Sequence, residues 1–250
     1  AFGGNFYEII VGGAAFNQEI EAFLRSINFP YTVGYGMTEC GPIICYEDWN
    51  IFKAGSCGKA APRMEVKILS TDPQNVPGEI ITRGDNVMLG YYKDPARTKS
   101  VFTEDGWFRT NDIAVLDEKG RFHIKGRNSN MILGPSGENI YPEEIENVIN
   151  NVEGVSESIV VERDGRLVAL IQPAENFIKW DKESEDKLYE KLDAWKAKVL
   201  SVTNKNVNKS SQVSAVEVMK EPFEKTATQK IRRFLYKKSA PTVEEEKKDK

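Results

Sequence analysis

The spacing of apolar residues changes along this chain of 250 residues, and the change restricts the chain to a mixed fold. The run Phe6 to Val11 is β-prone and ends at a pair of glycines, whereas Asn17 to Ile27 carries apolar residues at helical spacing. The run Phe29 to Tyr35 returns to a β-like composition. A strand, a glycine turn, a helix and a strand in this order predict an α/β portion at about residues 1–55.

The next segment, from Ser56 to about Lys125, consists of short alternating runs separated by turns. Pro77-Gly78 and Lys119-Gly120 are two of these turns. The pattern predicts a small antiparallel β-barrel at about residues 56–126. With the α/β portion, the barrel would form the end of one large domain, at residues 1–126.

The last segment combines helical and strand patterns. Pro142, followed by two acidic residues, opens a helix, and Asp164-Gly165 is a strong hairpin signal between two apolar runs. Residues from about Glu185 to Val202 carry one apolar stripe at helical spacing. The tail is nearly all charged or small. We therefore expect a small α+β domain and then a disordered tail, at residues 127–238 and 239–250.

The composition argues against several classes of protein. A formal net charge of −4 does not favour a nucleic-acid binder, which needs an excess of Lys and Arg. Because no run of about 18 apolar residues occurs, we expect a soluble protein. Cys40, Cys45 and Cys57 are odd in number and lack CxxC spacing, which favours reduced thiols in the cytoplasm over disulfides or a zinc site. His123 is the single histidine, which excludes a zinc site built on histidines.

Six motifs follow one another along the chain. They are Val11-Gly12-Gly13-Ala14, Tyr35-Gly36-Met37-Thr38-Glu39, Gly78-Glu79-Ile80 with Gly90-Tyr91-Tyr92, Gly106 to Asp112, Lys125 to Glu146, and Lys225 to Arg233. Taken singly, most have a simpler explanation, such as a turn, a helix cap or a solvated basic face. Together and in this order they resemble the adenylate-forming superfamily, which contains acyl-CoA synthetases, luciferases and the adenylation domains of peptide synthetases.

The resemblance implies roles for the first two motifs. It assigns to the nucleotide the residues Gly12, Gly13, Ala14, Tyr35 and Gly36. Glycines permit close backbone approach, and the ring of Tyr35 offers a flat face for adenine. The hydroxyl of Thr38 suits a phosphate oxygen, and the carboxylate of Glu39 is a hard ligand suited to Mg²⁺.

The same resemblance places the ribose on two residues of later motifs. Asp112 would accept hydrogen bonds from the ribose diol, and Arg127 would contact the ribose or a phosphate. Asn111 stands where the family usually has glycine. Ser129 stands at the hinge position, where Asp or Lys is common.

Two residues of the last domain would serve the two half-reactions. Gly137 would let the pantetheine arm of coenzyme A pass, because a side chain there would block it. Lys230 is the implied catalytic lysine, whose ammonium group would reach the acyl carboxylate and the α-phosphate. Gln229 replaces the glycine that usually precedes this lysine.

The implied function is part of a fatty acid–CoA ligase. The carboxylate attacks the α-phosphate of Mg·ATP and expels pyrophosphate, and the thiol of coenzyme A then attacks the acyl-adenylate and releases AMP. The C-terminal domain would swing about the hinge between these steps. A long-chain acid is the favoured substrate, because the residues around Gly34–Pro42 and Gly84–Tyr92 look most like those of long-chain synthetases.

The family's phosphate loop, T-S-G-T-T-G-x-P-K-G, does not occur in the sequence. The first residues, Ala1 to Asn5, also lack an initiating Met or a signal-like segment. We therefore expect a fragment that is inactive by itself and whose partner is the missing N-terminal portion of the same chain.

Alternatives stay open at this point. A homologue could transfer its acyl group to a carrier-protein phosphopantetheine, or could keep the fold as a binding module without turnover. The basic residues around Lys230 could form an anionic-membrane patch and so a peripheral membrane contact. The oligomeric state is not predicted.

Overall fold

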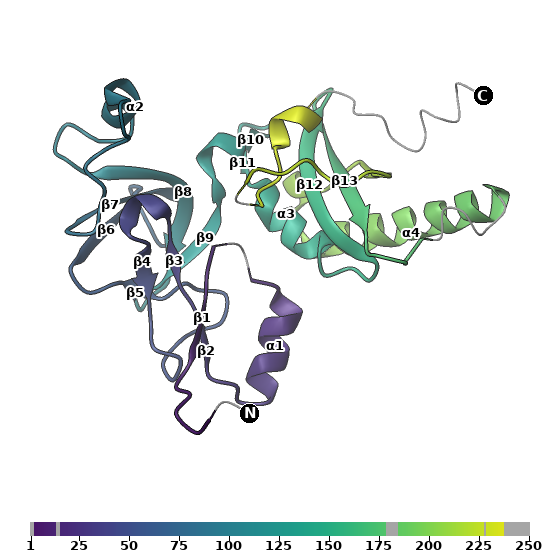
Figure 1. Ribbon diagram of the computed structural model, residues 1–250. Coiled ribbons are helices and arrows are strands. Elements are labelled where there is room, and N and C mark those ends of the chain that lie inside the picture. The colour runs from purple at the N-terminus through teal and green to yellow at the C-terminus, as the bar shows by residue number, and fades with distance from the viewer. Residues whose placement is uncertain (1–2, 14–15, 179–184, 228, 238–250) are drawn as a thin grey trace. The chain divides into compact units, whose positions relative to one another are not determined.

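The computed structural model describes residues 3–13, 16–178, 185–227 and 229–237 (Figure 1). The chain divides into two compact units between Ser129 and Asn130. The boundary expected from the sequence, between residues 126 and 127, lies just before this point. The tail expected to be disordered lies outside the described residues. In the part of the chain that is described, no helix has the length and apolar character to cross a membrane.

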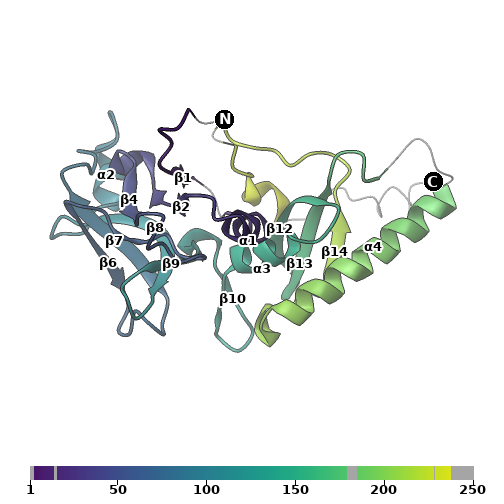
Figure 2. The ribbon, with the colours of Figure 1, turned by 90° about the horizontal axis from the view of Figure 1, so that it is seen from below.

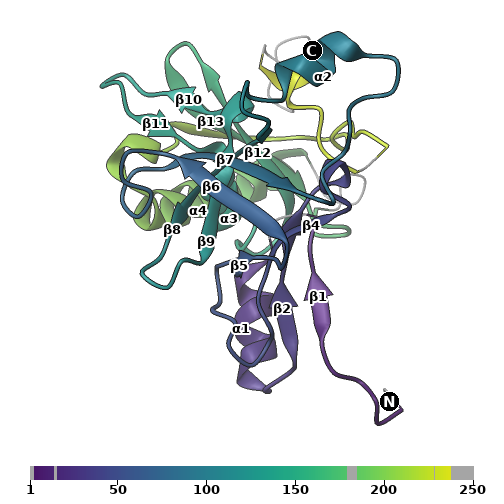
Figure 3. The same cartoon turned by 90° about the vertical axis from the view of Figure 1, so that its left-hand side faces the viewer.

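The first unit opens with the expected α/β portion, in which two parallel strands pair side by side and the helix that connects them lies to one side of the pair (Figure 3). The helix begins after Asn17, whose side chain accepts the N–H groups of Glu19 and Ile20 at 2.9 and 3.0 Å. The buried Glu21 accepts the N–H of Gly55 at 3.2 Å and so fixes the helix to a distant loop. In chain order, these elements are β1 (Ile9–Val11), α1 (Gln18–Ser26) and β2 (Tyr31–Val33).

A small antiparallel sheet follows, in which the short helix η1 (Thr38–Cys40) connects two strands. The connection is tight, because the N–H of Met37 donates to the carbonyl of Pro42 at 2.8 Å. A Cβ atom on Gly36 would lie 1.9 Å from that carbonyl oxygen, so only glycine fits at this position. The strands are β3 (Tyr35–Gly36), β4 (Ile43–Tyr46) and β5 (Lys59–Ala60).

A four-stranded antiparallel meander completes the first unit. Its strands are β6 (Met64–Leu69), β7 (Gly78–Gly84), β8 (Phe108–Leu116) and β9 (Phe122–Arg127), with α2 (Pro95–Ser100) between β7 and β8. The apolar core lies between this sheet and the previous one, and it consists of Cys40, Ile44, Cys45, Cys57, Met64, Ile68, Ile80, Phe108, Ala114 and Phe122.

The expected β-barrel is not formed by the described strands, because no ladder closes the sheets into a ring. At one edge, Phe122 exchanges backbone hydrogen bonds with Cys57 and Gly58, and this joins β9 to the residues just before β5. At the other edge β6 pairs only with β7. Among the described strands, the smaller sheet, β3-β4-β5, forms no ladder with β6, so the ring stays open at that edge.

The second unit is α+β and is built on a three-stranded sheet, β12-β13-β14, in which β13 and β14 are parallel. Asp164 and Gly165 take positive φ angles of 51° and 71° in the turn between β12 and β13, as the hairpin signal predicts. The elements are β10 (Ile132–Leu133), β11 (Asn139–Ile140), α3 (Pro142–Ile149), β12 (Val155–Arg163), β13 (Arg166–Pro173), α4 (Glu185–Asn206) and β14 (Ala215–Val218), with the short helices η3 (Lys209–Ser211) and η4 (Arg233–Tyr236). The short helix η2 (Asn128–Asn130) spans the boundary between the two units.

The two faces of this sheet bury separate apolar clusters. One face packs against α3 and α4, with Ile145, Ile149, Leu192 and Val199 from the helices in its core (Figure 2). The other face is covered by the chain after β14, which contributes buried residues including Met219, Phe223 and Tyr236. This chain segment also carries the motif from Lys225 to Arg233, so packing against the sheet fixes the motif in place.

Candidate functional site

Three of the predicted site residues meet at one carboxylate in the first unit. The hydroxyl of Tyr35, on β3, donates to Oδ2 of Asp112 at 2.7 Å. The Nε of Arg127 lies 3.1 Å from the other oxygen, Oδ1, because Asp112 on β8 pairs directly with Arg127 on β9. Burial, and then the charge of Asp112, raises the pKa of Tyr35 well above its ordinary value. The phenol therefore stays protonated and donates to a carboxylate whose two oxygens are held in place.

The glycine motif after β1 lies beside the strand that carries Tyr35. The N–H of Gly34 donates to the carbonyl of Val11 at 2.8 Å. A Cβ atom on Gly12 would lie 3.2 Å from the carbonyl oxygen of Gly34, so the two chains approach closely here. Gly13 takes a φ of 92°, which favours glycine. The predicted role of Ala14 concerns a residue outside those described.

Glu39, the predicted Mg²⁺ ligand, is half-buried in η1 and is held by a residue that the sequence analysis did not single out. The hydroxyl of Tyr91 donates to Oε1 of Glu39 at 3.0 Å, and the N–H of Met88 donates to the Glu39 carbonyl at 2.8 Å. The guanidinium of Arg97 lies 4.0 Å from the centre of the Tyr91 ring. The preceding residue, Thr38, is exposed. The sequence signal for Tyr91 is its motif, Gly90-Tyr91-Tyr92, which by itself indicates no role at the site.

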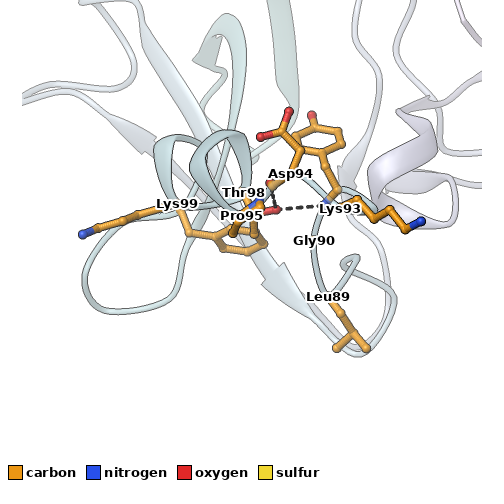
Figure 4. A pocket seen from close by; sticks show the side chains of 9 residues that line it. Leu89, Gly90, Lys93, Asp94, Pro95, Thr98 and Lys99 are labelled. Carbon is orange, nitrogen blue, oxygen red and sulfur yellow. Dashed lines mark hydrogen bonds between the residues drawn. The ribbon is translucent and has the colours of Figure 1, made fainter.

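An open pocket of about 550 Å³ lies next to Tyr91 (Figure 4). Thr98 accepts the N–H of Tyr91 at 2.9 Å and thereby closes the loop above α2. Leu89 is fully exposed at the end of this loop. None of the predicted site residues lines the pocket, which is formed by Leu89, Gly90, Tyr91, Lys93, Asp94, Pro95, Thr98, Lys99 and Phe102.

One of two substitutions in the motifs has a local explanation. Asn111 has a φ of 63°, and asparagine is the residue besides glycine that most readily adopts this conformation. Its side-chain amide donates to the hydroxyl of Ser129 at 3.0 Å, so the residue before the ribose-binding candidate is bonded to the predicted hinge. Gln229 also takes a positive φ, of 61°, and nothing in the structure explains the glutamine at this position.

The remaining predicted residues belong to the second unit. Gly137 lies in the turn between β10 and β11 with a φ of 83°, and a Cβ atom there would meet no atom within 4 Å. Lys230 is exposed on a hairpin in which Lys225 and Ile231 form an isolated bridge. The N–H of Thr226 donates to the carbonyl of Lys230 at 2.8 Å. Gly137 therefore lies in a turn with free space beside its Cα, and Lys230 has an exposed side chain.

The described residues contain no group of three or more His, Cys, Asp or Glu side chains that could hold a metal ion by themselves. A single carboxylate such as Glu39 is nonetheless typical of Mg²⁺ sites, because Mg²⁺ is usually bound by one or two carboxylates together with phosphates and water. The role of Glu39 stays a prediction.

Comparison with known proteins gives matches along the chain. The family described as AMP-binding enzyme matches residues 3–92. A long-chain-fatty-acid–CoA ligase of Escherichia coli O157:H7 is 42% identical over 133 residues, which are 51% of this chain and 23% of that protein. A chloroplastic long-chain-fatty-acid–[acyl-carrier-protein] ligase of Arabidopsis thaliana is 32% identical over 253 residues, which are 90% of this chain and 33% of that protein.

Solved structures match nearly the whole chain. The o-succinylbenzoate–CoA synthetase of Bacillus subtilis, in complex with its acyl-adenylate intermediate, superposes with a TM-score of 0.77 at 26% identity and covers 94% of this chain and 46% of its own. The same synthetase with ATP and a magnesium ion gives a TM-score of 0.75 at 26% identity, over 91% of this chain and 45% of its own. Among the curated relatives, the chain spans 23% to 35% of their length.

Proposed function

We propose that this chain, which is homologous to AMP-binding, adenylate-forming enzymes over part of their length, carries the ribose-binding and thioester-forming parts of an acyl-CoA ligase. Such an enzyme activates a carboxylic acid with ATP and passes the acyl group to coenzyme A. The homology to acid–CoA ligases supports this reaction class.

The observation that carries the proposal is the carboxylate of Asp112. Its two oxygens are oriented by Tyr35 and Arg127, which come from strands far apart in the sequence. An oriented carboxylate can accept two hydrogen bonds from a vicinal diol, and the ring of Tyr35 lies next to it for stacking on a base. A ribonucleotide offers both groups, so a nucleotide such as ATP or AMP fits this arrangement.

Glu39 fits a magnesium ion that arrives with the triphosphate. The hydroxyl of Tyr91 orients its carboxylate, and the neighbouring Thr38 is accessible to a phosphate oxygen. When bound, Mg²⁺ would neutralise charge on the phosphates. In this proposal Tyr91 keeps Glu39 directed toward the ion, and Glu39 supplies one hard oxygen ligand.

The second unit would supply Lys230 to adenylation and the Gly137 turn to thioester formation. The unit boundary at Ser129 supports a hinge there, because residues that connect compact units can absorb the change in backbone angles of a domain motion. Exposure of Lys230 and the free space around Gly137 support their roles. Because the reaction has two steps, the Lys230 hairpin would occupy the active site during adenylation and the Gly137 turn would replace it during thioester formation.

We further propose a long-chain fatty acid as the substrate, on the strength of the identity to the long-chain-fatty-acid ligase of Escherichia coli O157:H7. Transfer to an acyl carrier protein is the second candidate, favoured by the Arabidopsis thaliana relative, whose similarity extends over 90% of the chain. Both acceptors present a phosphopantetheine thiol. Comparing coenzyme A with acyl carrier protein as acceptors for one acyl-adenylate decides between them.

Nucleotide binding by this chain tests the proposed function directly. Asp112→Asn removes the charge but keeps the shape, so it should lose the preference for AMP over 2′-deoxy-AMP. The loss should be about 1.5–3 kcal/mol per charge-assisted hydrogen bond. Calorimetric titration with both nucleotides measures the preference, and the exposed Asp105→Asn serves as a matched control. A preference that survives in Asp112→Asn would reject the assignment.

A further inference from the structure

A buried, bidentate ion pair lies next to the motif that carries Lys230. Arg233, at the start of η4, donates through Nη1 to Oε1 of Glu146 at 2.5 Å and through Nη2 to Oε2. Glu146 lies on α3 and is only 5% exposed. Its Oε1 also accepts the N–H of Val160 on β12 at 2.7 Å. The pair therefore joins the motif to a helix and to the central sheet, with a fork geometry that fixes direction as well as distance.

The short segment from Lys230 to Arg233 leaves little freedom between the lysine and the ion pair. Ile231 forms the bridge with Lys225 and packs against the core of the sheet. The N–H of Arg232 donates to the carbonyl of Glu224 at 2.9 Å. An anchor at Arg233 therefore restrains the described residues of the hairpin, 225–227 and 229–231, and with them the point from which the side chain of Lys230 extends.

The other end of the hairpin is held independently. The rings of Phe223 and Tyr236 meet edge to face, with centroids 5.3 Å apart, and the N–H of Glu224 donates to the hydroxyl of Tyr236 at 2.8 Å. Lys225 pairs with Glu157 at 2.7 Å. Apolar packing therefore attaches the hairpin to the unit near Glu224, and the ion pair holds its other end, after Lys230.

We propose that Glu146 and Arg233 are positioning residues for Lys230 in the adenylation half-reaction, a role that rests on the proposed function of Lys230. A buried ion pair is a poor source of stability, because desolvation offsets most of its attraction. Its two parallel hydrogen bonds do fix the orientation of Arg233 relative to Glu146, and so the direction in which the neighbouring chain runs. An error of about 1 Å in the position of a reacting group can reduce a rate about 10²-fold.

The thioester half-reaction provides an internal control within the same unit. The turn around Gly137 is held by its own pairing of Ile132 with Ile140 and by the bond from the Gly137 N–H to the Gly134 carbonyl at 2.9 Å. Neither contact involves Glu146 or Arg233. Loss of the ion pair should therefore disturb the hairpin of Lys230 and leave the Gly137 turn intact.

The first test measures both half-reactions in the longest natural polypeptide that contains these residues. Arg233→Lys keeps the charge but removes the fork, and Glu146→Gln keeps the shape but removes the charge. Each should slow adenylation by about 10²-fold, while thioester formation from supplied acyl-adenylate keeps most of its rate. Val199→Ala, which opens a cavity beneath α4 away from the hairpin, is the control for lost stability. Equal losses in both half-reactions for the ion-pair variants would overturn the proposal.

The second test needs no activity and uses this chain alone. Trypsin cleaves after Lys230 only when the hairpin opens. Cleavage there should therefore be faster in Glu146→Gln and Arg233→Lys than in Val199→Ala, when the variants are compared under conditions in which the same fraction of each is unfolded. Unchanged cleavage would contradict positioning by the ion pair. Failure of the proposed function looks different: Lys230→Ala would then adenylate at the wild-type rate, whatever the cleavage experiment shows about the hairpin.

Discussion

At the scale of single residues, the candidate site depends on how Asp112 is oriented. Sequence motifs identify Tyr35, Asp112 and Arg127 as separate candidates, but they do not state that the three side chains touch. The contact arises from pairing between the consecutive strands β8 and β9 and from the position of β3, which is distant from both in the sequence. Asn111 shows what else the sequence leaves out. The sequence shows that asparagine replaces glycine, but only the structure shows that the backbone keeps a positive φ there and that the side chain bonds to Ser129.

A residue-scale prediction concerns the hydroxyl of Tyr35. Tyr35→Phe keeps the flat ring but leaves Oδ2 of Asp112 without its phenolic donor. Because a hydrogen bond to a charged group contributes about 1.5–3 kcal/mol, the affinity for AMP should fall by about tenfold or more. Titration with AMP measures the change, and the exposed Tyr92→Phe should bind as the unmodified chain does. Undiminished affinity in Tyr35→Phe would show that the hydroxyl does not prepare the site.

At the scale of secondary-structure elements, local signals predict more than pairing signals do. The helix that begins at Pro142 and the turn at Asp164-Gly165 are formed where the sequence indicates, because capping and turn chemistry depend on neighbouring residues. The β-barrel is different, since its closure depends on which strand edges meet. The alternating runs indicate strands but carry no information on whether β6 and β9 join through further strands, and in the described residues they do not.

The turn between β3 and β4 provides an element-scale prediction. In Gly36→Ala the new Cβ would overlap the carbonyl oxygen of Pro42, so the hairpin that carries η1 has to open. We expect a loss of about 3 kcal/mol in the free energy of unfolding of the first unit. Gly106→Ala is the matched control, because its φ is positive but its Cβ would meet no atom, and it should cost about 1 kcal/mol. Equal destabilisation of the two variants in urea titrations would contradict this account of the turn.

At the scale of the whole molecule, the two half-reactions are assigned to different turns of one unit. The family described as AMP-binding enzyme matches residues 3–92, within the first unit, whereas Gly137 and Lys230 belong to the second. The two roles rest on motif order and on the local geometry of each turn. The motifs propose Gly137 and Lys230 separately, but no motif pairs Glu146 with Arg233, because their contact joins positions 87 residues apart.

The most direct measurement compares Lys230→Ala and Gly137→Leu in the longest natural polypeptide that contains this sequence, with each half-reaction assayed separately. Lys230→Ala should reduce pyrophosphate release by about 10²–10³-fold, because an electrostatic contact made in the transition state is lost. Supplied with acyl-adenylate, it should still form thioester. Gly137→Leu should do the reverse and accumulate acyl-adenylate while thioester formation fails. Equal losses in both half-reactions for both variants, in proportion to a lowered melting temperature, would contradict the assignment of the two turns to separate steps.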